Sequence, residues 1–318
     1  MSKLSFVKLF TVEKYYGFKH NVIMAEKLNS LPPVAEMMRG AGLEPKRQLG
    51  QNFLFDLNLT LRIARAVPDI ENTTVIEVGP GPGGLTRALL SLGAKRVIAI
   101  EKDKTTASIL EQISAASDDR LEIIFADALK LFEPLQEECG KGVFHVSEKI
   151  ASSVIASGSA TRNDIHNKYA ICSNLPYNIG TELLIRWLRM DNISSMTLMF
   201  QREVAQRIVA KVGNPQYGRL SVLTSLTADA KILFDVPNTA FVPRPKVQSA
   251  VVQIFPRSRI ECITKVERLT AKLFGQRRKM IRGIMPDINW PEFGLTGRER
   301  AEELSPEKFA EIAAKIMI

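Results

Sequence analysis

Apolar residues between positions 57 and 256 follow two patterns that alternate along the chain. Short apolar runs rich in β-branched residues predict buried strands, because a strand covered on both faces is continuously hydrophobic. We expect such strands at 74–78, 96–100, 121–126, 169–173 and 195–200. Apolar residues spaced three or four apart predict amphipathic helices, among them 57–67, 85–92, 104–115 and 182–190. This alternation predicts an α/β fold with a Rossmann-like, mainly parallel sheet.

The pattern changes towards the C-terminus. Helices are expected at 201–207 and 217–228, and strands 231–236 and 247–255 are expected to close the sheet as an antiparallel pair. Beyond Pro256, helices at 266–281, 298–304 and 306–316 predict a small C-terminal helical domain, with Ser305 capping the last helix. The predicted domains are therefore an N-terminal extension at 1–44, a Rossmann-like domain at 45–256 and a helical domain at 257–318.

Two segments are harder to assign. Residues 1–30 have no clear period, although a short helix is expected at 34–40. Residues 133–168 also lack a period, and about 45 residues separate Asp127 from Asn174, more than an ordinary crossover needs. We expect a helix near 131–138 followed by a mobile surface excursion.

The strand 74–78 runs directly into a glycine loop, Gly79-Pro80-Gly81-Pro82-Gly83-Gly84, which precedes a helix. The glycine spacing is typical both of dinucleotide-binding proteins and of S-adenosylmethionine enzymes. A pyrophosphate is bound by backbone N–H groups at a helix start, and prolines have none. The loop therefore favours a ligand without phosphates, such as S-adenosylmethionine, although a glycine turn that serves packing alone is the alternative.

Acidic residues follow the next two predicted strands. Glu101 comes roughly twenty positions after the glycine loop, where a carboxylate accepts bonds from both ribose hydroxyls of a nucleotide cofactor. Asp127 can accept a bond from the adenine amine of that cofactor. The alternatives are a solvated Glu101 and an Asp127 that caps a helix.

The fourth strand leads into Asn174-Leu175-Pro176-Tyr177. An open α/β sheet places its ligands at the carboxyl ends of its strands. We interpret this segment as a clamp for a flat base: the Asn174 side-chain oxygen and the Pro176 carbonyl accept bonds from an exocyclic amine, and Tyr177 stacks on the ring. The alternative is a turn in which Tyr177 only packs. Phe241 either projects towards this clamp or fills the core.

Charge and composition narrow the function. The chain has 318 residues, 45% of them hydrophobic, and a net charge of +9, which favours an anionic partner such as nucleic acid. The basic run Gln276-Arg277-Arg278-Lys279 is expected on a helix, where Arg277, Arg278 and Lys279 can bind RNA phosphates, unless this is simply a solvated face.

Cysteine and histidine are sparse. The three cysteines, Cys139, Cys172 and Cys262, are expected to be free thiols, and no metal site is expected because no histidine has a partner at ligand spacing. No apolar run is long enough to cross a bilayer, and charges interrupt the start of the chain. We expect a cytoplasmic protein.

Together these segments resemble the ribosomal RNA adenine dimethyltransferase family, and within it the bacterial small-subunit members. The resemblance covers about residues 45–310, apart from the excursion. Its motifs are Gln51-Asn52-Phe53-Leu54, Glu77 to Gly83, Glu101, Asp127-Ala128-Leu129, Asn174 to Ile179, Phe200 to Ala205, Phe241 to Ser249, Gln276 to Lys279 and Arg300 to Ser305. The departures are the excursion, the extended start and Gly180, where many members carry Ser or Thr.

The resemblance implies an S-adenosylmethionine-dependent methyltransferase with a Rossmann-like sheet. It implies that the cofactor is bound by Asn52, Leu54, Gly79, Glu101, Asp127 and Asn174. It also implies a substrate: two adjacent adenosines near the 3′ end of small-subunit (16S) rRNA, dimethylated at N6 within a pre-ribosomal 30S particle late in subunit assembly. We expect a monomer. The alternatives are a large-subunit rRNA methyltransferase, a nicotinamide oxidoreductase and an assembly factor that mainly binds pre-ribosomal RNA.

Overall fold

The computed structural model describes residues 26–46, 50–132, 168–257 and 263–316. These residues form two compact units. The first comprises the described residues up to Leu131 together with Lys168–Pro176 and Pro237–Lys246; the second comprises Phe132, Tyr177–Val236 and the described residues from Val247 onward. The chain therefore changes unit more than once, and one of these changes falls between Pro176 and Tyr177.

A parallel sheet with the order β4-β3-β2-β5 forms the centre of the first unit. Its strands are β2 (Thr74–Val78), β3 (Arg96–Glu101), β4 (Leu121–Phe125) and β5 (Tyr169–Asn174). The chain adds β3 and β4 on one side of β2 and then returns to add β5 on the other. The carboxyl ends of β2 and β5 thus flank a topological switch point, which is where open α/β sheets bind ligands.

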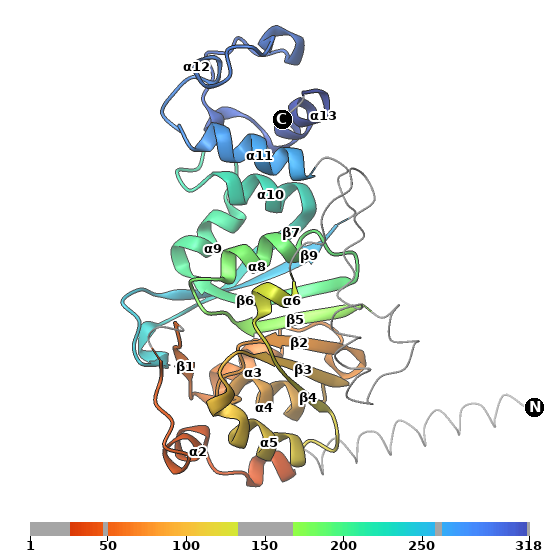
Figure 1. The fold of residues 1–318 in the computed structure, drawn as a ribbon, viewed down its shortest axis with the longest axis vertical. Coiled ribbons are helices and arrows are strands. Elements are labelled where there is room, and N and C mark those ends of the chain that lie inside the picture. Colours follow the sequence, from red (N-terminus) through yellow and green to blue (C-terminus); the bar gives the residue numbers. More distant parts are fainter. Residues whose placement is uncertain (1–25, 47–49, 133–167, 258–262, 317–318) are drawn as a thin grey trace, which may run out of the picture. The chain divides into compact units, whose positions relative to one another are not determined.

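Helices lie beside this sheet in the first unit, and Figure 1 shows α3, α4 and α5 next to β2, β3 and β4. They are α2 (Val34–Gly40), α3 (Leu57–Ala64), α4 (Gly84–Ser91), α5 (Ala107–Ala115) and α6 (Ala128–Leu131), with 3-10 turns η2 (Ile70–Asn72) and η3 (Lys104–Thr106). Asp56 caps α3 as predicted, because its Oδ1 accepts bonds from the backbone N–H groups of Asn58 (2.8 Å) and Leu59 (3.2 Å).

A two-residue strand, β1 (Phe53–Leu54), pairs antiparallel with β8 (Phe241–Val242), which follows the 3-10 turn η5 (Asn238–Ala240). This pairing joins two loops that lie almost 190 positions apart. The sequence pattern did not predict it, because two residues are too few to show a period. The buried Phe241 (2% exposed) is consistent with its packing alternative.

The second unit contains an antiparallel sheet with the order β6-β9-β7. Its strands are β6 (Ile193–Gln201), β7 (Ala228–Val236) and β9 (Ser249–Pro256), so the antiparallel pairing of the last two strands is confirmed. The helices α8 (Gly180–Trp187), α9 (Arg202–Val209) and α10 (Arg219–Thr227) belong to the same unit.

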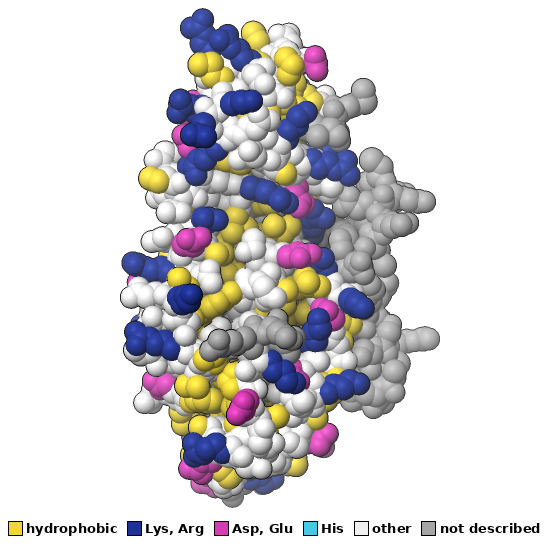
Figure 2. All heavy atoms as spheres, turned by 60° about the vertical axis from the view of Figure 1, so that its left-hand side comes forward, with side chains coloured by type: hydrophobic (Ala, Val, Ile, Leu, Met, Phe, Trp, Pro, Cys, Tyr) yellow, Lys and Arg dark blue, Asp and Glu magenta, His cyan; other side chains and the backbone are white. Residues whose placement is uncertain are grey.

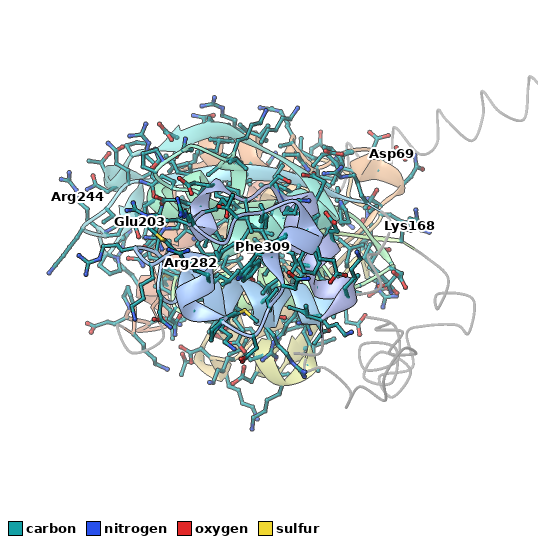
Figure 3. The ribbon with its side chains drawn as sticks, turned by 90° about the horizontal axis from the view of Figure 1, so that it is seen from above. Asp69, Lys168, Glu203, Arg244, Arg282 and Phe309 are labelled. Carbon is teal, nitrogen blue, oxygen red and sulfur yellow. The ribbon has the colours of Figure 1, made fainter. Side chains whose placement is uncertain are left out.

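The C-terminal helices of the second unit are α11 (Ile263–Phe274), α12 (Ile281–Ile284) and α13 (Pro306–Lys315), with 3-10 turns η6 (Trp290–Phe293) and η7 (Ala301–Glu303). Phe309, labelled in Figure 3, is fully buried in their core and stacks on Phe274 at 5.6 Å. This core also contains Tyr217 and Leu223 from the α10 region. The domain boundary at 256/257 stays a prediction.

Two helix predictions are wrong near the basic run. The helix predicted at 266–281 ends at Phe274, because Gly275 and the residues after it form turns, such as the bond from Lys279 N to Gln276 O (2.8 Å). The segment predicted as helical at 298–304 contains only the 3-10 turn at Ala301–Glu303, since Arg300 pairs in an extended bridge with Met280.

Several predictions fall on residues outside the described part of the chain. They are most of the N-terminal segment without a clear period, most of the helix near 131–138, the excursion and two of the cysteines, Cys139 and Cys262. The third cysteine, Cys172, is free and buried. Within the described ranges, no helix is long and apolar enough to cross a membrane.

Candidate active site

The glycine loop at the end of β2 is closely covered by β1. Gly81 has a φ of +54°, and a Cβ there would lie 2.6 Å from the Phe53 ring. A Cβ on Gly84 would lie 2.7 Å from the backbone oxygen of Leu54. Because Pro80 and Pro82 have no N–H, the loop has few hydrogen-bond donors for a phosphate. It allows a ligand to approach its backbone closely instead.

Glu101, at the end of β3, is held against this loop. Its Oε2 accepts the Gly81 N–H (3.0 Å) and its Oε1 accepts the Asp103 N–H (2.7 Å). The side chain is 5% exposed, and this burial raises the pKa of the carboxyl while the backbone bonds oppose the rise. Each oxygen keeps a second lone pair, so the orientation suits two neighbouring hydroxyls.

Asp127 lies at the end of β4 and is partly exposed. Its Oδ1 accepts the Leu129 N–H (3.0 Å), so the capping role at the start of α6 is present in the structure. Its Oδ2 accepts a bond from Lys102 Nζ (2.9 Å), and this bond is the main cause that lowers the pKa of Asp127. The contact with a cofactor adenine stays a prediction.

Asn174, at the end of β5, meets the segment that carries Asn52. The Asn174 Nδ2 donates to the Asn52 backbone oxygen (3.0 Å), although the two residues are 122 positions apart. A carbonyl only accepts hydrogen bonds, so this contact fixes which end of the amide is Nδ2 and leaves Oδ1 as an oriented acceptor. Leu54 continues the same segment and is 5% exposed.

Pro176 packs beside the glycine loop. A Cβ added to Gly79 would lie 3.4 Å from the Pro176 Cδ, which places the clamp segment next to the first loop glycine. The structure thus gathers six predicted residues around the switch point of the first unit: Asn52, Leu54, Gly79, Glu101, Asn174 and Pro176. Tyr177 belongs to the second unit, where its hydroxyl bonds to Ser249 Oγ (2.6 Å).

A network around Asp103 was missed by sequence reasoning. Asp103 Oδ1 accepts from Lys46 Nζ (2.8 Å), and Asp103 Oδ2 accepts from Gln51 Nε2 (3.1 Å). Burial would raise the pKa of Asp103, but the bonds from Lys46, Thr105 and Gln51 outweigh it and hold the pKa at about 2. The available signal was an Asp-x-Thr turn that begins two residues after Glu101, because such residues bond their own backbone at a helix start.

A second carboxyl lies beneath the loop. Glu77, in β2, is 1% exposed and accepts a bond from Thr86 Oγ1 (2.6 Å). Burial raises its pKa to about 8, and the Thr86 bond opposes part of that rise. This carboxyl is therefore largely protonated at neutral pH. Among the described residues, no cluster of His, Cys, Asp or Glu is suited to a metal ion.

The basic run 276–279 lies in the turn after α11, and its cations differ. Arg277 forms hydrogen bonds within the second unit: its Nε donates to Glu302 Oε2 (2.6 Å), and its guanidinium also donates to the Pro215 oxygen (2.8 Å). Arg278 and Lys279 are exposed. Lys and Arg side chains are spread over the face in Figure 2, with fewer acidic ones among them.

Comparisons with known sequences identify the family. The sequence model described as "Ribosomal RNA adenine dimethylase" matches residues 42–317. The chain belongs to the ribosomal RNA adenine dimethylase family. Membership confirms the predicted enzyme class, a methyltransferase that acts on rRNA adenines with S-adenosylmethionine as methyl donor. It does not support the alternative of a nicotinamide oxidoreductase.

Relatives of the rRNA adenine dimethylase family cover nearly the whole chain. "Ribosomal RNA small subunit methyltransferase A" of Mesorhizobium japonicum is 46% identical over 91% of this chain and 99% of its own length. The protein of the same description from Brucella melitensis is 46% identical over 90% of this chain and 98% of its own.

Solved structures confirm the predicted Rossmann-like fold class. A dimethyladenosine transferase from Plasmodium falciparum matches with a TM-score of 0.60 at 20% identity, covering 82% of this chain and 95% of that one. The 23S rRNA methyltransferase ErmE matches with a TM-score of 0.54 at 21% identity, covering 83% and 98%. At these identities the structures inform the fold alone.

Proposed function

We propose that this enzyme transfers methyl groups to the N6 amines of two adjacent adenosines near the 3′ end of 16S rRNA, giving N6,N6-dimethyladenosines late in assembly of the small subunit. We infer this substrate from the relatives described as small-subunit methyltransferases, which are 46% identical to this chain, and not from the more distant large-subunit enzyme. The observation that carries the chemistry is the oriented Asn174 amide at the switch point. A cytoplasmic, monomeric enzyme acting on a pre-ribosomal 30S particle completes the proposal.

The residues of the first unit fit S-adenosylmethionine. A Cβ on Gly81, Gly83 or Gly84 would lie less than 3 Å from a neighbouring atom, and the buried Glu101 carboxylate is held by two backbone N–H groups with acceptor positions to spare. We assign its binding to Asn52, Leu54, Gly79, Glu101, Asp127 and Asn174. When bound, this cofactor supplies an electrophilic methyl group on a sulfonium.

The clamp residues are suited to activate the adenine amine of the substrate. An adenine amine is a poor nucleophile because its lone pair is delocalised into the ring. In our proposal Asn174 Oδ1 and the Pro176 carbonyl accept the two N–H groups, which localises the lone pair and stabilises positive charge that develops on nitrogen. Stacking on Tyr177 contributes about 1–3 kcal/mol, and the base must leave its own stack to enter the site.

The deciding experiment uses labelled S-adenosylmethionine and undermodified small subunits, followed by mapping of the labelled nucleosides. We expect label in two adjacent adenosines of 16S rRNA. Label only in large-subunit RNA, or in no adenosine, would contradict the substrate assignment.

An Asn174→Ala variant separates catalysis from a role in binding alone. We expect it to bind the immature subunit normally and to lose at least about 100-fold in transfer rate, because removal of one preorganised group of this kind costs 10²–10³ in rate. The matched control is Asn58→Ala, an exposed asparagine of α3, which should transfer at the normal rate. Full activity of Asn174→Ala would reject the clamp.

A further inference from the structure

Tyr177 is anchored by Ser249, the last residue of the motif that begins at Phe241, to which the sequence alone assigned no role. The Tyr177 hydroxyl and Ser249 Oγ lie 2.6 Å apart, within the second unit. The Tyr177 side chain is partly exposed, whereas Ser249 is fully buried. Burial raises the pKa of the Tyr177 hydroxyl, so at neutral pH both partners are uncharged and either one can donate.

Ser249 occupies an unusual place for a polar side chain. It begins β9, the middle strand of the β6-β9-β7 sheet, and its register partners are Gln201 on β6 and Val236 on β7. The next residues of the strand, Ala250 and Val251, are fully buried and apolar. A buried hydroxyl needs a partner to offset its desolvation, and Tyr177 is the side chain that supplies one.

The consequence is a fixed ring plane. A tyrosine ring turns about two side-chain bonds, and a partly exposed ring would sample several orientations. A short hydrogen bond from its far end to the middle strand of a sheet restricts both rotations. A stacking platform depends on that plane, because base and ring must stay parallel while the amine is aligned with its acceptors.

We propose that Ser249 is a positioning residue that fixes the plane of Tyr177 against the target adenine. This inference rests on the proposed function, and it has a consequence specific to dimethylation. In the first transfer the amine nitrogen bonds to the methyl carbon as the carbon–sulfur bond of the sulfonium breaks, and one amine proton passes to water. The monomethyl amine keeps one N–H, so one of its two acceptor contacts is lost. Stacking then carries more of the alignment, and the second transfer depends more on Ser249 than the first.

The test measures both transfers in single-turnover reactions on undermodified small subunits, for Ser249→Ala, Ser249→Thr, Tyr177→Phe and the double variant Tyr177→Phe/Ser249→Ala. We expect Ser249→Ala to slow the first transfer about tenfold and to lower the ratio of second to first rate constants further. Ser249→Thr should recover most of the rate of the first transfer and most of the ratio of second to first rate constants. Affinity for S-adenosylmethionine should not change, because the residues assigned to it lie in the first unit.

The two single variants and the double variant also form a double-mutant cycle. If the serine acts through the tyrosine hydroxyl, Tyr177→Phe, Ser249→Ala and the double variant share one defect, because each removes the same bond. Ser195→Ala is the matched control: it removes another buried serine hydroxyl, from the neighbouring strand β6, and should keep the wild-type ratio.

Three outcomes would overturn the inference: a wild-type ratio in Ser249→Ala, additive defects in the cycle, or the same defect in Ser195→Ala. If Ser249→Ala does not fold, Tyr177→Phe alone decides, since it deletes the bond from the other side. A wild-type enzyme that forms no dimethyladenosine would instead contradict the proposed function.

Discussion

A hydrogen bond to a backbone carbonyl orients the amide of Asn174, and orientation can be separated from acceptor strength. In Asn174→Asp an acceptor oxygen remains, but a carboxylate oxygen would face the Asn52 carbonyl, where the native Nδ2 donates. Two acceptors repel, so the side chain should turn away. We expect a loss of transfer rate similar to that of Asn174→Ala, measured in single turnover. Near-normal transfer would show that an oxygen suffices without this orientation.

The buried Glu77 gives the stability of the enzyme a pH dependence. The carboxyl ionises near 4.5 in the unfolded chain and at about 8 in the folded protein. Between these values only the folded form keeps the proton, so each rise in pH favours unfolding, and stability falls until about pH 8. Glu77→Gln keeps an acceptor for Thr86 and removes the titration. The free energy of unfolding is measured in urea at pH 6 and pH 8.5, without cofactor. Its change between the two pH values should be smaller for Glu77→Gln than for the wild type.

At the scale of elements, the contact of β1 with the start of α4 decides which glycines are replaceable. A Cβ on Gly84 would meet the Leu54 carbonyl at 2.7 Å, and backbone cannot move aside as a side chain can. We expect Gly84→Ala to displace β1, lower the melting temperature and weaken S-adenosylmethionine binding measured by calorimetry. In Gly40→Ala, at the end of α2, the methyl meets open space and should stabilise the fold by about 0.5–1 kcal/mol. Equal effects of the two would contradict the packing argument.

The turn after α11 separates a structural arginine from two exposed cations. Replacing Arg278 and Lys279 with Ala should weaken RNA binding. It should also make the fall of the log of the binding constant with log salt concentration less steep, by about 1.4–1.8, since each phosphate contact contributes about 0.7–0.9 to this slope. The control is Arg65→Ala with Lys95→Ala, two exposed cations of the first unit. Arg277→Ala should instead lower stability, because it removes the bonds to Glu302 and Pro215. An unchanged slope in the first variant would reject this patch.

The elements differ in how far sequence could predict them. The strand predicted at 74–78 is confirmed at its bounds, because its β-branched run is bounded by a glycine loop and a turn. The helix through residue 281 was extended too far, since apolar spacing continues past Gly275 although the backbone turns there. The pairing of β1 with β8, the Asp103 network and the bond between Tyr177 and Ser249 join residues distant in sequence, and no local period encodes such contacts.

At the scale of the whole molecule, the residues assigned to the cofactor all belong to the first unit, and those of the C-terminal helices to the second. A ligand stabilises the states that bind it, by about 2.7 kcal/mol at a concentration 100 times its Kd. Amides whose exchange requires opening of the first unit should therefore exchange more slowly with S-adenosylmethionine, by up to about 100-fold. The effect should be largest in β2, β3 and the start of α4.

Hydrogen exchange with and without S-adenosylmethionine measures this directly. Amides of α11 and α13 should exchange at unchanged rates if the second unit opens independently, because cooperative units of one protein open with their own free energies. Equal protection of α13 and β3 would contradict this expectation and mean that the two units unfold as one. The Gly84→Ala variant supplies the control, since weakened cofactor binding should abolish the protection of β3 at the same ligand concentration while leaving exchange in α13 as it is in the wild type.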